Sequence, residues 1–390
     1  MCNLRKCRKK QALNRLLSSN FIIQNNLKNK HELGGTLNLY ATGPRHSLNG
    51  NWNAFAGTLN VYGQKTGSYD PECTFNNSNG MRNATLNVTT RMSNSGKAFA
   101  IGQLTGNGTL AGGGRYTVGY LNQDITFNGT IEGCPITKVG SGTWTLSKVN
   151  SNLGSGNIEV RGGLLNINNT QASELFFGTH QVVVQDSGTL GGRGYLQSIM
   201  LQNGGTLKPG NATADFVVGL LKVKESIFAY EGSHIQLFIY NNKNTSTSRS
   251  YLDVGSMLSI DGDITVTMKS YTPKLGDEIL FWNAKAISGT PTAVYLPDIS
   301  SYGLAWDTSD LMTTEGILRV IADESSISEM ADNTPVSGTV YTLSGMYKGY
   351  VECQRNQLVP SLRKQGIESG TYLVRLKSQK HSETVKVTIR

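Results

Sequence analysis

The sequence predicts an all-β protein in which a right-handed parallel β-helix, or a related solenoid, is followed by a small C-terminal β-sandwich. The first observation is the composition: 45 of the 390 residues are Gly, 9 are Pro and 16% are charged, which suits short strands joined by tight turns. The second is the length, which exceeds one ordinary core unless the fold is a repeat that grows without a size limit. The third is a recurring motif.

This motif is a small residue, then Thr, then a large apolar residue, and it recurs mostly at intervals of about 20 to 27 residues. Each copy begins an alternating strand, as in residues 36–40 and 58–62, with apolar side chains on one face and polar ones on the other. Such a strand cannot bury its apolar face alone, so we expect successive coils to stack about 4.8 Å apart. The copies begin at Gly35, Gly57, Ala84, Gly108, Gly129, Gly142, Gly188 and Gly205.

We therefore expect mostly parallel strand pairing over residues 31–270, with the Gly of the motif at a corner of the coil, where φ is positive. An antiparallel β-sandwich is the other fold that the sequence leaves open, because Asn-Gly pairs typical of hairpin turns begin at Asn49, Asn79 and Asn128. The leucines expected in the core are Leu37, Leu59, Leu86, Leu110, Leu190 and Leu207.

Changes in composition divide the chain into five predicted segments. Residues 1–30 form a basic, poorly ordered segment, and residues 31–270 form the solenoid repeats. Residues 271–320 are expected to cap the solenoid, because its last coil would otherwise expose unpaired backbone. Residues 321–337 are acidic and Ser-rich and are interpreted as a linker. Residues 338–390 contain three strong strands and are predicted to form a minimal β-sandwich, less stable than the solenoid.

Aromatic residues supply the predicted cap with apolar surface. Tyr271, Phe281, Trp282 and Trp306 all lie within residues 271–320 and could cover the open end of the last coil. The sequence thus predicts that they are buried.

The net charge of +9 does not indicate a nucleic-acid-binding protein. The first thirty residues hold eight Lys and Arg and no acidic residue, so the remainder carries only about +1. No run of about eighteen apolar residues predicts a transmembrane segment. Because no apolar signal-peptide region follows the basic start, we expect this to be a C-terminal fragment whose N-terminus is not native. A genuine basic tail that contacts anionic surfaces is the alternative.

The five cysteines are Cys2, Cys7, Cys73, Cys134 and Cys353. Their number is odd and none stands in a C-x-x-C arrangement, which predicts neither a metal site nor a disulfide framework. A pair between Cys73 and Cys134 stays open.

Two stretches of the chain resemble known families. Residues 138–147 read KVGSGTWTLS, residues 154–164 continue with spaced Gly and apolar residues, and residues 204–211 read GGTLKPGN. This pattern, over about residues 130–270, resembles the autotransporter-associated β-strand repeat. The aromatic residue usual near Asn150 is missing and Asn157 stands where Thr is usual, so the number of repeats stays open.

The C-terminus resembles the sorting domain of the type IX secretion system of Bacteroidetes. Residues 340–345 read VYTLSG, residues 370–374 read GTYLV, and a Lys-Val pair stands close to the end. The resemblance implies export across the outer membrane, the secretion machinery as a partner, and an extracellular or outer-membrane surface location. The matched residues are Tyr341, Leu343, Gly345, Gly370, Tyr372 and Lys386.

The sequence predicts no catalytic residue and no cofactor. Its five His residues lie far apart, and neither a G-x-S-x-G nor a Walker-type loop occurs. A polysaccharide lyase or hydrolase built on a β-helix is the enzyme hypothesis that we keep as a minority alternative. In it, Arg82, Arg91, Lys97 and Arg115 would lie along one face of the solenoid.

Two groups of residues are candidates for ligand binding. The aromatic residues Trp52, Phe55, Tyr62 and Tyr69 could bind a polysaccharide by stacking, the alternative being that they fill the core.

Acidic residues form the second group. Asp253, Asp261 and Asp263 could bind Ca²⁺ through their carboxylates, the alternative being a polar turn. Together these features predict a non-catalytic stalk or secretion module for an upstream domain, with an adhesin or glycan-binding module as the first alternative.

Overall fold

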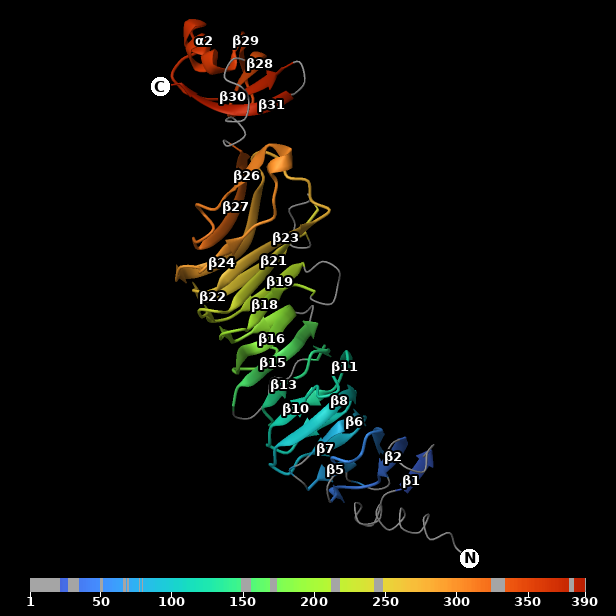
Figure 1. Cartoon of the computed structure of the whole chain (residues 1–390). Helices are drawn as coiled ribbons and strands as arrows, with labels where there is room; N and C mark the ends of the chain where they lie inside the picture. Colours follow the sequence, from blue (N-terminus) through green and yellow to red (C-terminus); the bar gives the residue numbers. More distant parts are fainter. Residues whose placement is uncertain are drawn as a thin grey trace, which may run out of the picture. The chain divides into compact units, whose positions relative to one another are not determined.

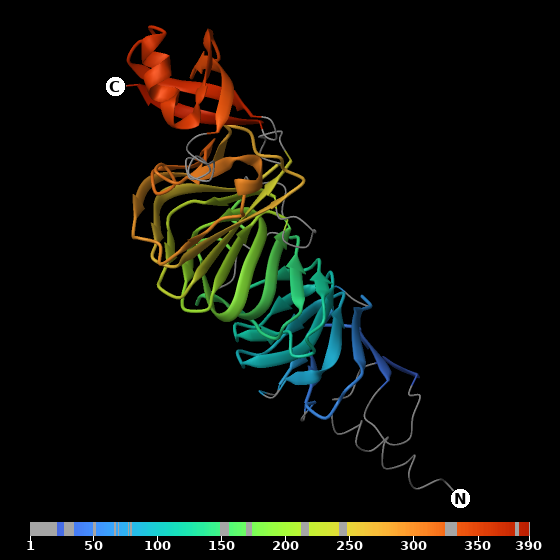
Figure 2. The same cartoon turned by 45° about the horizontal axis from the view of Figure 1, so that its top comes forward.

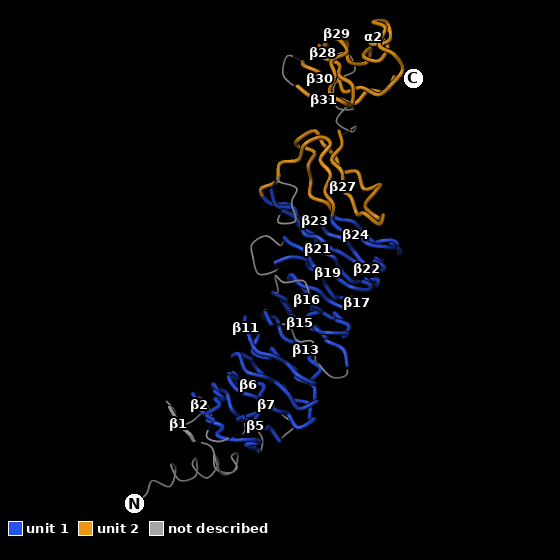
Figure 3. Tube along the Cα trace, turned by 180° about the vertical axis from the view of Figure 1, so that it is seen from behind, with its two compact units in different colours: residues 1–269, 281–295 blue, residues 270–280, 296–390 orange. Residues whose placement is uncertain are grey.

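The computed structural model describes residues 22–26, 35–49, 52–65, 68, 70–76, 78, 80–148, 156–168, 174–211, 218–241, 248–323, 334–378 and 382–389. The chain is all-β, as predicted, with 59% strand and 4% helix. It forms two compact units, residues 1–269 with 281–295, and residues 270–280 with 296–390 (Figure 3). The predicted basic segment, residues 1–30, lies outside the described residues except for the strand β1 (Ile22–Asn26).

Strands of the first unit pair in parallel with strands one coil later in the sequence. Leu37 of β2 aligns with Leu59 of β4, which aligns with Leu86 of β6, and β6 pairs in turn with β8. Figures 1 and 2 show these strands side by side. The prediction of mostly parallel pairing is confirmed, and the six motif leucines are at most 2% exposed. The bounds are β2 (Thr36–Ala41), β4 (Thr58–Gly63), β6 (Met81–Val88) and β8 (Phe99–Gly106).

The polar residues of the motif form ladders on the outward face. The amide of Asn60 donates to Oδ1 of Asn38 at 2.7 Å, and the amide of Asn87 donates to Oδ1 of Asn60 at 2.9 Å. The rings of Tyr40 and Tyr62 stack with centroids 5.0 Å apart. Because each contact joins one coil to the next, the outward side chains help to hold the register that the buried leucines require.

A second parallel sheet lies in the N-terminal coils, and large aromatic side chains fill their interior. Trp52 contacts Phe75 at a centroid distance of 6.0 Å, Phe75 contacts Phe99 at 4.5 Å, and Phe99 contacts Tyr116 at 6.1 Å. All four residues are at most 1% exposed. The strands of this sheet are β3 (His46–Leu48), β5 (Glu72–Phe75), β7 (Arg91–Ser93), β9 (Thr109–Ala111) and β12 (Thr130–Ile131).

Parallel pairing continues through the later coils. At Gly192, where φ is +107°, a Cβ atom would lie 2.0 Å from the carbonyl oxygen of Ile167 in the neighbouring coil, so only Gly fits this position. The strands are β10 (Tyr116–Val118), β11 (Ile125–Phe127), β13 (Ile136–Lys138), β14 (Thr143–Leu146), β15 (Ile158–Asn168), β16 (Gln181–Leu196), β17 (Ser198–Leu201), β18 (Thr206–Pro209), β19 (Gly219–Val223), β20 (Ile227–Ala229), β21 (His234–Tyr240), β22 (Ser250–Ile260), β23 (Asp263–Lys269), β24 (Glu278–Ser288) and β25 (Val294–Tyr295).

Six of these strands form a closed ring of pairings, β8–β10–β13–β15–β14–β11 and back to β8. The ring closes because one edge of β8 and one edge of β15 are each shared by two strands, while β6 and β16 pair with these long strands as well. Residues 99–101 of β8 pair with β10, whereas Gly106 pairs with β11. The long strands β8 and β15 thus join two ladders.

The parallel ladders extend beyond the predicted boundary at residue 270. Trp282 of β24 pairs with Leu252 of β22, and Val294 of β25 pairs with Ile264 of β23. The predicted cap, residues 271–320, is therefore wrong for residues 281–295, which add further strands to the stack. Sequence reasoning missed this because β24 and β25 carry no copy of the Gly-Thr-apolar motif.

Residues 296–322 do differ from the coils, as the cap prediction requires. The strands β26 (Leu304–Asp307) and β27 (Glu315–Ala322) pair antiparallel after a short 3-10 helix, η1 (Ser300–Tyr302). Trp306 donates from Nε1 to the carbonyl of Pro297 at 2.8 Å and lies 6.5 Å from the ring of Tyr271. Of the four predicted cap aromatics, Phe281, Trp282 and Tyr271 are buried and Trp306 is half-buried.

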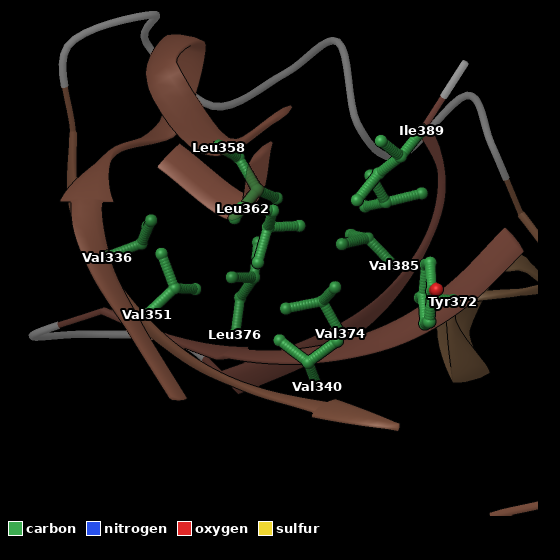
Figure 4. Close-up of a cluster of buried hydrophobic side chains, with 11 residues drawn as sticks. Val336, Val340, Val351, Leu358, Leu362, Tyr372, Val374, Leu376, Val385 and Ile389 are labelled. Carbon is green, nitrogen blue, oxygen red and sulfur yellow. The ribbon is translucent and has the colours of Figure 1, made fainter. Parts of the chain in front are cut away.

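The C-terminal residues form one antiparallel sheet in the order β29–β28–β30–β31, with a helix packed on one face. Figure 4 shows Leu358 and Leu362 of the helix pointing toward Val336, Val351 and Leu376 of the sheet. The elements are β28 (Pro335–Thr342), β29 (Tyr347–Gln354), the 3-10 helix η3 (Arg355–Gln357), α2 (Leu358–Lys364), β30 (Gly370–Lys377) and β31 (Ser382–Ile389).

Two predictions for this end of the chain need correction. The predicted β-sandwich, residues 338–390, lacks a second sheet among the residues described, because α2 supplies the apolar cover instead. The short helix carries Pro360 and only two fully buried leucines, too weak a pattern to reveal it in the sequence. The predicted linker, residues 321–337, is too long at both ends, since β27 ends at Ala322 and β28 begins at Pro335. Residues 324–333 lie outside the described part of the chain.

Candidate functional site

The predicted aromatic glycan site is wrong for two of its four residues. Trp52 is 1% exposed and Phe55 is 8% exposed, and their rings meet edge to face at 5.9 Å. They fill the core, so their ring faces are not available to a sugar. Tyr62 is half-buried against Tyr40, and Tyr69 lies outside the described residues.

The predicted Ca²⁺ ligands are each engaged by a neighbouring residue. Asp253 lies 3.8 Å from Nζ of Lys222, and Asp263 lies 3.4 Å from Nδ1 of His234. Oδ1 of Asp261 accepts a hydrogen bond from the backbone N–H of Thr290 at 3.3 Å. Within the described part of the chain, no group of three or more His, Cys, Asp or Glu could hold a metal ion.

Basic side chains that could have served a lyase are likewise engaged by the coils around them. Arg91 pairs with Glu72 at 3.1 Å and with Glu132, which lies on its other side along the sheet. Arg115 lies 3.3 Å from Glu159. Arg82 lies over the ring of Tyr120 at 4.8 Å, and Lys97 donates to the carbonyl of Asn76 at 2.8 Å. These contacts join neighbouring coils rather than converge on a cleft.

The buried cysteines remain thiols. Cys73 and Cys134 are both free, so the disulfide left open by the sequence is not formed. Burial raises the pKa of the Cys134 thiol to about 11 and that of Cys73 further, which keeps both protonated at neutral pH.

Lys138, the first residue of the autotransporter-like motif, lies inside the coil and not on its surface. It occupies an interior column between Val118 and Val160 and is 1% exposed. Its Nζ donates to the carbonyls of Val139, Gly140 and Gly162 at 2.7, 2.9 and 2.9 Å. Sequence reasoning missed this role, although a Lys followed closely by Gly140 and Gly142 was a signal for it. The ammonium thus ties together two successive corners of the coil.

This geometry predicts a pH dependence of stability. Burial lowers the pKa of Lys138 from 10.5 to about 8, while the carboxylate of Asp124 acts in the opposite direction. Between pH 8 and 10.5 the unfolded chain holds a proton that the folded chain has lost, so stability rises with pH. From pH 7.5 to 9.5, the free energy of unfolding of the wild type should rise by about 2 kcal/mol relative to Lys138→Met. Denaturant titration measures it. The control variant Lys224→Met changes an exposed position, so its unfolding free energy should show the same pH dependence as that of the wild type. Identical pH profiles for the wild type and Lys138→Met would refute the prediction.

The residues that resemble a sorting signal come together in the C-terminal sheet. Gly345, with φ at +82°, closes the turn between β28 and β29, where its N–H donates to the carbonyl of Thr342 at 2.9 Å. Leu343 in the same turn is 61% exposed. Tyr341 aligns through Leu373 with Lys386 in the register of β28, β30 and β31.

The remaining two motif residues have structural roles. Gly370 begins β30 opposite Ile389 of β31. Tyr372 is 8% exposed in the core, and its hydroxyl donates to the carbonyl of Glu368 at 3.0 Å. The motif therefore divides into residues that build the fold and two exposed residues, Leu343 and Lys386, with Tyr341 half-buried.

The face of this sheet that points away from α2, here called the open face, is basic and aromatic. Arg375, Lys377 and Lys386 project from it and are exposed. Tyr350 aligns with Thr339 on the same face and is 49% exposed. Over residues 335–390 the sequence has nine Lys and Arg against three Asp and Glu, whereas residues 31–334 have nineteen against twenty-four. The net charge of residues 31–390 is close to zero, so it did not reveal that the basic residues are concentrated at the C-terminal end.

Comparison with known proteins adds no family. No protein-family model matches the chain, and no curated protein matches it. In the part of the chain that the structure describes, no helix has the length and apolar character needed to cross a membrane.

Proposed function

We propose that this chain is a non-catalytic, secreted module in which a right-handed parallel β-solenoid serves as a stalk for a domain joined upstream. In this proposal the C-terminal domain is read by the type IX secretion machinery and directs the protein to the outer-membrane surface or the medium. The observation that carries the proposal is the C-terminal domain itself: it has its own apolar core, Leu343 and Lys386 are exposed, and Tyr341 is half-buried.

The first unit has the properties that a stalk requires. The strands β2, β4 and β6 pair without a shift of register between Thr36 and Val88, and polar side chains bond to the next coil, as in the ladder of Asn38, Asn60 and Asn87. Each coil therefore depends chiefly on its neighbours, so a solenoid can extend without a change of fold. The right-handed sense is proposed because crossovers between parallel strands are right-handed in nearly all proteins.

Deletion of residues 335–390 tests the export role. In a host that carries a type IX system, the truncated protein should accumulate in the periplasm, while the wild type reaches the surface or the medium. Cell fractionation with immunoblotting measures the distribution. Circular dichroism and thermal unfolding of the purified truncated protein should show that the first unit remains folded, because its ladders involve no residue of β28 to β31.

The reciprocal experiment joins residues 324–390 to a periplasmic reporter protein. The fusion should be exported, and the same fusion with Lys386→Glu and Leu343→Asp should be retained, since both residues are exposed and neither belongs to the core. Export of the truncated protein would refute the sorting role. Unfolding of the first unit on truncation would show instead that the C-terminal domain is needed for its stability.

A further inference from the structure

Two aromatic side chains stand next to each other at the end of β20 in the first unit, one within the strand and one directly after it. Phe228 and Tyr230 have ring planes 14° apart and centroids 6.5 Å apart. Tyr230 is 45% exposed and Phe228 is half-buried, while Ile227 before the pair and Ala229 between its two members are buried. Of the two, Tyr230 presents the larger part of its side chain to solvent. Neither the stalk nor the export role uses this pair.

Residues of the neighbouring coils place polar groups around the rings. Leu201 of β17 aligns with Ala229, which aligns with Ile260 of β22. The following residues therefore form one outward row across three coils, Gln202, Tyr230 and Asp261. Both Gln202 and Asp261 are half-buried, and Oδ1 of Asp261 accepts the N–H of Thr290 at 3.3 Å, which fixes the carboxylate at the edge of the row.

A second outward row lies two residues earlier. Here Met200, Phe228 and Ser259 align across the same three coils. The two rows together give an apolar and aromatic centre with an amide on one side and a hydroxyl and a carboxylate on the other. We refer to these six residues as the aromatic platform.

We propose that the aromatic platform is a binding site for the pyranose rings of an uncharged polysaccharide. Sugar rings present an apolar C–H face that packs on an aromatic ring, and a rim of hydroxyls that bonds with amides and carboxylates. The platform offers both, with Phe228 and Tyr230 below the sugar and Gln202 and Asp261 beside it.

Charge decides between polysaccharide classes. None of the six platform residues is Lys or Arg, and the single charged one is the carboxylate of Asp261. An anionic polysaccharide would meet repulsion from Asp261 and no compensating cation on the platform. A neutral glycan has no such penalty, and its hydroxyls can donate to this carboxylate.

The test is affinity electrophoresis and calorimetry of the full chain with neutral β-glucan, mannan and galactan, and with anionic alginate. We expect binding to at least one neutral polysaccharide and none to alginate. Tyr230→Ala should weaken it by about tenfold and the double variant Phe228→Ala/Tyr230→Ala further, because ring stacking accounts for about that factor. Tyr230→Phe, which keeps the ring, should retain most of the affinity.

Tyr302→Ala is the matched control, since this tyrosine is 50% exposed and lies in the other unit. Its affinity should equal that of the wild type, and thermal unfolding should show that every variant is folded. The proposal is overturned if no neutral polysaccharide binds, if alginate binds equally well, or if Tyr302→Ala loses as much affinity as Tyr230→Ala. Because all variants keep the C-terminal domain intact, these outcomes are independent of the export role.

Discussion

Replacement of Leu59 by Asp should unfold the N-terminal coils. Leu59 is 0% exposed and lies between Leu37 and Leu86 in a column of apolar side chains. An ionised carboxylate in that column has no partner, and its desolvation should destabilise these coils by more than about 4 kcal/mol. Hydrogen exchange followed by mass spectrometry should show loss of protection in β2, β4 and β6. Because coils interact mainly with their neighbours, β19 to β23 should keep their protection.

The matched control is Thr58→Asp, one residue earlier in the same strand. Thr58 is half-buried on the outward face, so water can solvate the new carboxylate and the loss should stay below about 1 kcal/mol. Equal loss of protection in the two variants would contradict the assignment of an inward and an outward face to β4.

Arg355→Met should unfold the C-terminal domain and leave the first unit intact. The guanidinium of Arg355 in η3 pairs with the carboxylate of Glu383 in β31, and their side chains are only 6% and 12% exposed. Removal of one partner leaves a buried charge without its counterion, which costs about 3–5 kcal/mol. A domain of this size has little stability to lose, so β28 to β31 should lose protection from hydrogen exchange.

Two further variants identify the cause of that loss. Arg355→Met combined with Glu383→Leu removes both charges and should restore much of the stability, because no unpaired charge remains. Arg375→Met, on the exposed face of β30, should be nearly neutral. A double variant as unstable as Arg355→Met alone would show that packing of the arginine, and not its charge, is responsible.

The ion pair also explains why part of the C-terminal domain escaped sequence reasoning. In the sequence, Arg355 and Glu383 are two ordinary charged residues 28 positions apart. Only the tertiary fold brings η3 and β31 together and buries both side chains. The same packing replaces the predicted second sheet with a helix.

The local pattern determined much of the first unit. A strand that alternates Thr or Asn with Leu has one apolar face. Because such strands recur at a coil-sized interval, stacked coils can enclose all of these apolar faces in one core. The parallel pairing, the burial of Leu37, Leu59 and Leu86, and the all-β class follow from this alternation alone.

The orientation of single aromatic and charged residues was decided by tertiary structure. Both pairs, Trp52 with Phe55 and Phe228 with Tyr230, consist of aromatic residues close together in the sequence. The first pair is nevertheless buried in the core, whereas Tyr230 is exposed. Composition cannot distinguish these cases, because the face that a side chain takes depends on where a coil turns its corner.

Sequence by itself determined the all-β class, the repeating coil and the C-terminal strands, since each rests on alternation and composition, which are local. Tertiary structure alone decided that Lys138 lies inside, bonded to three carbonyls, that Asp253, Asp261 and Asp263 serve neighbouring coils, and that Gln202, Tyr230 and Asp261 share a row. The physical reason is register: residues about 30 positions apart become neighbours only when one coil stacks on the next, and a shift of one residue would send each side chain to the opposite face.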